Sequence, residues 1–246
     1  MPDALHVLVV ADIRNAIGRV NDLCDYVIRH RPVDVVLVCG SFVAPAGLQS
    51  PEELAAAEGD MTALISRLEM IVCRVVYVPG PYDPSSTKRP TTKPFLPKLT
   101  PYSINCDGAS TVLLPETDGD RTLSQGSPLP ELVVEGWSSV IDGHVAMELR
   151  TKYAIDESQC SVYRKLARLP WCCRIGLSDH SFGSVDWIEK GQVLLRPGWF
   201  SSGSFAFVEF GPRTLGADTE DEDEDEEPAW DVKACEVLHL NDEFQG

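Results

Sequence analysis

Apolar residues follow two different periods along the first third of the chain. Short runs at 5–11, 34–39 and 73–78 are rich in valine and read as buried strands. Between them, residues 16–30 and the stretch from Pro51 to Leu68 repeat apolar positions at helical spacing, and Ser50–Glu53 predicts a capping box at the start of the second helix. A strand–helix–strand order predicts parallel strands joined by right-handed crossovers. We therefore expect these three strands to have their carboxyl ends on one edge of a sheet.

The rest of the chain is predicted to be richer in strands. Asp107-Gly108 separates two short runs, Tyr102–Cys106 and Ser110–Leu114, and so favours a hairpin. Residues 132–135 predict another strand, 115–130 a loop, and 145–169 a mostly helical segment. Further strands are expected at 171–176, 184–188, 192–196, 204–210 and 230–240. The length of 246 residues suits one domain over 1–246.

Charge is distributed unevenly along this acidic chain. The net charge is −17, and Asp218 with residues 220–227 supplies nine acidic groups, which leaves about −8 elsewhere. Like charges at this density repel one another and offer no apolar surface, so we expect a disordered loop over 217–228 between two strands. Nucleic-acid binding is not expected, because phosphate contacts need clustered Lys and Arg.

Membrane and secretory segments are not predicted. No apolar run approaches the ~20 residues that span a bilayer, and no basic region precedes an apolar one at the N-terminus. The eight cysteines form no CxxC pair and lie mostly inside predicted elements. This pattern predicts reduced thiols in an intracellular protein, cytoplasmic or nuclear.

The ends of the first three predicted strands carry polar residues. Asp12 and Arg14 follow the first strand, Gly40-Ser41 follows the second, and Asp83 lies in a proline-rich turn after the third. Sites in α/β folds are built at such strand ends. Asp83 is expected to cap the turn before Pro84.

These strand ends resemble the motifs of the calcineurin-like metallophosphoesterases, DxH, GD and GNH, which are followed by a lone His and GHxH. The resemblance implies a four-layer α/β/β/α fold, with a β-sandwich core flanked by helices. It places Asp12, Gly40-Ser41 and Asp83 at the first three motifs, His144 at the lone histidine, and His180 in the last. The spacing from Asp179-His180 to Arg196–Trp199 fits the NPGS turn of that family.

The chain departs from the family at the positions that hold its two metal ions. Arg14 stands in place of a histidine, Ser41 in place of the bridging aspartate, and Pro81-Tyr82 in place of Asn-His. A cation at residue 14 opposes metal binding and is expected to pair with Asp12. We therefore interpret Asp12, Asp83 and His180 as vestigial, and expect no cofactor.

Three functions remain open at this point. The first is a non-catalytic, phosphoesterase-fold protein that acts as a protein-binding or scaffold module. The second is an active metal-dependent phosphoesterase, a hydrolase with an eroded site in which Asp12, Asp83, His144 and His180 hold a divalent metal such as Mn or Fe/Zn. The third follows from a resemblance to the phosphoesterase domain of replicative DNA polymerase B-subunits, carried by Cys39–Phe42, Val78–Pro84 and Gly203–Phe207. It implies an accessory subunit of a polymerase-like complex.

A partner surface is predicted at the 80–101 loop. Its prolines restrict the conformations of the chain, which lowers the entropy cost of ordering on binding. Its basic residues suit a protein partner with an acidic or apolar face, which would also contact residues 40–48. The residues expected to bind the partner are Lys88, Arg89, Lys93 and Phe95. Trp199 and Phe200 are expected in the core rather than on a binding surface.

Overall fold

The structure is a computed structural model that describes residues 4–44, 50–80, 83, 99–106, 109–114, 131–136, 172–176, 181–189, 191–213 and 230–240. Several predictions therefore lie outside the described residues. They are the helix at 145–169, the loop at 115–130, the acidic run at 217–228, His144, His180 and the basic residues of the 80–101 loop.

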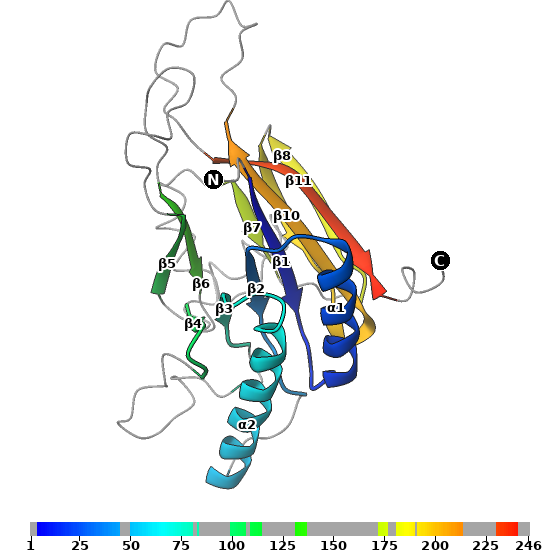
Figure 1. The fold of residues 1–246 in the computed structure, drawn as a ribbon, viewed down its shortest axis with the longest axis vertical. Coiled ribbons are helices and arrows are strands. Elements are labelled where there is room, and N and C mark those ends of the chain that lie inside the picture. Colours follow the sequence, from blue (N-terminus) through cyan, green and yellow to red (C-terminus); the bar gives the residue numbers. More distant parts are fainter. Residues whose placement is uncertain are drawn as a thin grey trace, which may run out of the picture.

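A six-stranded sheet forms the centre of the molecule, in the order β11-β10-β1-β2-β3-β4 (Figure 1). β1, β2, β3 and β4 run parallel, while β10 is antiparallel to both β1 and β11. The predicted parallel arrangement of the first three strands is confirmed. The bounds are β1 Leu5–Ala11, β2 Val35–Cys39, β3 Val75–Val78, β4 Ser103–Asn105, β10 Ser204–Pro212 and β11 Trp230–His239.

Two helices cover one face of this sheet, α1 (Ile17–His30) and α2 (Pro51–Leu68) (Figure 1). The start of α2 is fixed by a capping box, as the sequence predicts. Glu53 N donates to Ser50 Oγ at 3.1 Å, and Ser50 N donates to Glu53 Oε2 at 2.9 Å. Each bond satisfies a backbone donor that the helix itself leaves without an acceptor.

The opposite face packs against smaller sheets. One has the order β7-β9-β8, with β7 Cys173–Ile175, β8 Ser184–Glu189 and β9 Gln192–Arg196. The other pairs β5 (Ala109–Leu114) with β6 (Leu132–Gly136). At one end the backbones join directly, because Val232 N donates to Gly191 O at 3.0 Å.

The alternation of side chains along the central strands divides the apolar residues between two cores. On β10, Phe205 and Phe207 face the helices, whereas Ala206 and Val208 face the smaller sheets. β1 divides its valines and leucines in the same way, and Val7, Leu8, Val9 and Val10 are all fully buried. Because both faces of the sheet are covered, the sequences of these strands are continuous apolar runs and do not alternate between apolar and polar residues.

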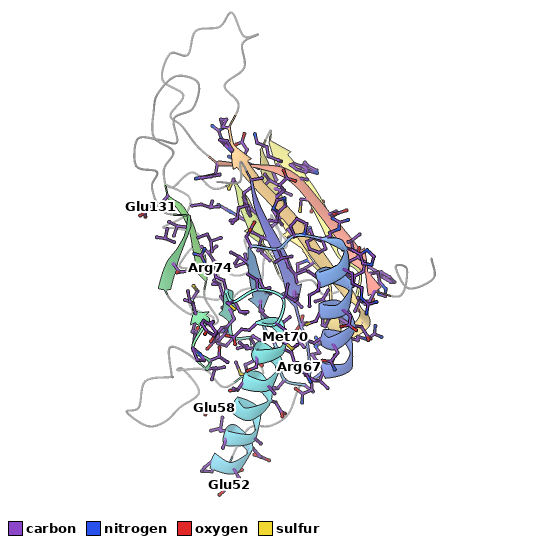
Figure 2. All side chains as sticks on the ribbon, viewed as in Figure 1. Glu52, Glu58, Arg67, Met70, Arg74 and Glu131 are labelled. Carbon is purple, nitrogen blue, oxygen red and sulfur yellow. The ribbon has the colours of Figure 1, made fainter. Side chains whose placement is uncertain are left out.

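The hairpin predicted across Asp107-Gly108 is wrong. Residues 103–105 form β4, which adds to the edge of β3, and Cys106 N donates to Tyr77 O at 2.9 Å. Residues 109–114 form β5, which pairs with β6 instead. Arg74, which precedes β3 and is labelled in Figure 2, supports this arrangement, because its Nη1 donates to Leu113 O at 2.6 Å.

The predicted α/β fold class is confirmed, with mixed sheets and two packed cores. The described residues form three of the four expected layers: helices, central sheet and the smaller sheets. β10 and β11 pair along their length, and the acidic run lies between them in the sequence. Within the described ranges, no helix is long and apolar enough to cross a membrane.

Candidate functional site

The loop between β1 and α1 has an unusual backbone. Asp12, Arg14 and Asn15 have φ angles of 51°, 50° and 62°, in the left-handed region that costs non-glycine residues about 1 kcal/mol each. The loop is held in this form by the end of β2. Asp12 N donates to Cys39 O at 3.1 Å, Arg14 N to Ser41 O at 3.1 Å, and Asn15 N to Phe42 O at 2.7 Å.

Asp12 is buried beside the end of β2. Its Oδ1 accepts a hydrogen bond from Ser41 N at 3.3 Å and lies 3.5 Å from Arg14 Nε. Its carbonyl oxygen accepts from Ser201 N at 3.1 Å. The predicted ion pair of Asp12 with Arg14 is confirmed. Both residues have a left-handed backbone, so the pair forms across a tight turn rather than along an extended segment.

Arg14 lies between two side chains that hold its guanidinium group. Asp12 contacts Nε, and the Trp199 ring lies beneath the guanidinium, with its centroid 4.6 Å from Cζ. A cation over an indole face is stabilised by about 0.5–2 kcal/mol. The Arg14 side chain is 26% exposed, so one part of it faces solvent. An arginine thus occupies the place where the family resemblance puts a metal-binding histidine.

Asp83 joins the ends of β2 and β3. Its Oδ1 accepts from Phe42 N at 2.8 Å and from Val43 N at 2.9 Å. Its Oδ2 accepts from Phe42 N at 2.9 Å and from Gly80 N at 2.8 Å. Three backbone N–H groups thus donate to this carboxylate, one of them shared by both oxygens, and they occupy most of its about four acceptor positions. Asp83 therefore caps its own turn at Gly80, as predicted, and also fixes the β2 end.

The β2 and β3 ends touch through their glycines. A Cβ on Gly40 would lie 2.1 Å from Gly80 N, and a Cβ on Gly80 would lie 2.5 Å from Ser41 Oγ. The peptide bond between Gly40 and Ser41 is cis. Ser41 and Asp83 are both fully buried. The backbones and the Ser41 side chain thus fill the space between these two strand ends.

Cys39 precedes this contact and carries an unreactive thiol. Desolvation, together with the nearby Asp12 carboxylate, raises the pKa of Cys39 to about 12. The thiol therefore stays protonated at neutral pH. Since a thiolate is the form that attacks substrates or binds metals, the raised pKa disfavours both roles for Cys39 at neutral pH.

The donor set at the described strand ends does not fit a two-metal centre. Asp83 accepts hydrogen bonds from three backbone N–H groups, and Asp12 is paired with a cation. Ser41, at the position of the bridging acid, offers a neutral hydroxyl in place of a carboxylate. Among the described residues, no group of three or more His, Cys, Asp or Glu side chains is placed to hold a metal ion.

The predicted site residues are brought together in part. Asp12, Ser41 and Asp83 meet at one edge of the sheet, as expected from three parallel strand ends. His180 and His144 lie outside the described residues. Ser181, which follows His180, contacts the expected turn, because Trp199 N donates to Ser181 O at 3.3 Å.

The contact of Trp199 with Arg14 was not predicted from the sequence. Phe200 is fully buried, as predicted, but Trp199 is only half-buried and stacks on Arg14. No spacing rule could find this contact, because the two residues are distant in sequence and the strand ends bring them together. Asp12, Arg14 and Asn15 in the β1–α1 loop have left-handed backbone conformations although none of them is glycine, so no glycine marks this turn in the sequence.

Comparisons with known proteins give similar structures but no related sequences. A scan against protein-family models and a search of curated proteins found no match. The crystal structure of TT1561 of Thermus thermophilus aligns with a TM-score of 0.53 at 12% identity, covering 83% of this chain and 94% of that one. A second crystal structure aligns with a TM-score of 0.52 at 13% identity, covering 84% and 95%.

A third structure is a conserved uncharacterized protein from Streptococcus pneumoniae TIGR4, described as a predicted phosphoesterase. It aligns with a TM-score of 0.41 at 13% identity, covering 98% of this chain and 92% of that one. A score this low does not establish a shared fold. The first two alignments show a shared α/β fold and nothing further, because their identities are so low. The resemblance to polymerase B-subunits is not tested by any of the three and stays a prediction.

Proposed function

We propose that this chain is a non-catalytic protein of phosphoesterase-like fold that acts as a protein-binding or scaffold module. The observation that carries the proposal is the set of hydrogen bonds that the Asp83 carboxylate accepts from three backbone N–H groups. Coordination of a metal by Asp83 would have to break these bonds and leave buried donors unsatisfied. Each such donor costs about 1–3 kcal/mol.

The surroundings of Asp12 support the same proposal. Arg14 already neutralises its charge at 3.5 Å, and Trp199 covers one face of that arginine. A divalent ion beside Asp12 would be repelled by the guanidinium at short range. Both surviving acids therefore have structural partners, which supports closed and buried strand ends rather than an open metal site.

A test of catalysis uses the wild-type chain expressed with Mn²⁺ in the medium. We expect less than one metal ion per chain by mass spectrometry and no hydrolysis of bis-p-nitrophenyl phosphate above a buffer control. Stoichiometric metal together with hydrolysis that Asp12→Ala abolishes would contradict the proposal and favour the active phosphoesterase. Asp25→Ala is a suitable control, since Asp25 is an exposed acid on α1 that pairs with Arg29.

The proposed partner surface is the 80–101 loop together with residues 40–48. Its basic residues lie outside the described ranges, so the proposal rests on their charge in an acidic chain. Affinity capture with the triple variant Lys88→Glu, Arg89→Glu and Lys93→Glu should lose specific proteins that the wild type retains. An unchanged set of captured proteins would place the surface elsewhere.

A further inference from the structure

We draw no further inference here: the strongest candidate, the surface patch of exposed apolar side chains on and beside β8 at the edge of the β7-β9-β8 sheet (Phe182, Trp187 and Ile188), carries nothing because no contact among the described residues shows what covers it.

Discussion

Gly40 and Gly80 pack backbone against backbone at the ends of β2 and β3. A Cβ on residue 40 would lie 2.1 Å from Gly80 N and 2.4 Å from Asp83 Oδ2. Neither neighbour is the flexible end of a long side chain, since one is main chain and the other is fixed by its hydrogen bonds. The two strand ends therefore depend on glycine at residue 40.

Gly40→Ala should destabilise the chain by about 1–3 kcal/mol or more, as overpacking of a filled interior does. Urea unfolding measures the effect. Gly59→Ala is the matched control, because nothing lies within 4 Å of its added Cβ in α2. That variant should stabilise the chain by roughly 0.5–1 kcal/mol, since alanine is the better helix former. Equal stability of Gly40→Ala and the wild type would contradict the packing described here.

Asp83→Ala should cost about 3 kcal/mol or more in the free energy of unfolding. It leaves the buried N–H groups of Phe42, Val43 and Gly80 without their acceptor, and each unsatisfied donor costs about 1–3 kcal/mol. Asp25→Ala removes an exposed acid of an i,i+4 pair and should change stability by less than about 0.5 kcal/mol. Similar losses in the two variants would show that Asp83 does not join the strand ends.

Ser41→Asp should not create hydrolytic activity, and neither should Ser41→Asp combined with Arg14→His. Ser41 is fully buried against Gly80, so the longer carboxylate has no space and no counter-charge of its own. We expect a less stable chain and no turnover of bis-p-nitrophenyl phosphate with Mn²⁺. Turnover by the double variant would mean that the strand ends can still open into a metal site.

Replacement of residues 217–228 by a short Gly/Ser linker should leave the melting temperature within a few degrees of the wild type. β10 and β11 pair from Ser204 with His239 to Pro212 with Trp230, and this pairing does not involve the acidic run. Nine like charges also have little apolar surface to bury. A loss of about 2–5 kcal/mol, comparable to a core truncation, would show that the run packs on the protein.

Stability should fall as pH rises above about 9, where ordinary thiols lose their proton. Desolvation raises the pKa of Cys39 and Cys235 to about 12, and that of Cys24 and Cys106 to about 11. The folded chain keeps protons that the unfolded chain has lost, so their contribution is complete below about pH 9 and is lost as pH approaches the folded values.

Urea unfolding at about pH 8 and about pH 10 measures this loss. The loss of stability between the two pH values should be smaller in Cys39→Ala, because this variant lacks one of the thiols with a raised pKa. A control is Cys73→Ala, since Cys73 is exposed. If Cys39→Ala and Cys73→Ala lose the same stability between the two pH values, thiol titration at Cys39 makes no contribution.

The sequence predicts those parts of the fold that depend on local patterns. Valine-rich runs separated by helical spacing correctly predict β1, β2 and β3, and the Ser50–Glu53 pattern correctly predicts the start of α2. The hairpin at Asp107-Gly108 failed because a turn signal reports the local backbone and not the partner of each strand. β4 pairs with β3 in the central sheet, whereas β5 pairs with β6 in a smaller sheet.

The candidate site could be predicted at the level of its residues but not of their contacts. The loss of the bridging acid at Ser41 and the cation at Arg14 are visible in the sequence. The contact of Arg14 with Trp199, and the hydrogen bond from Phe42 N to Asp83, join residues far apart in the chain. They arise because three strand ends and the 199–203 turn share one edge, which tertiary packing alone establishes.

The position of β1 constrains how the chain is made on the ribosome. β1 pairs on one side with β2, which follows soon after it, and on the other with β10, where Leu5 lies opposite Phe210. While most of the polypeptide is being synthesised, one edge of a strand built almost wholly of valine and leucine lacks its native neighbour. A nascent chain that stalls before residue 212 would expose this edge, and so would be prone to pair with other chains.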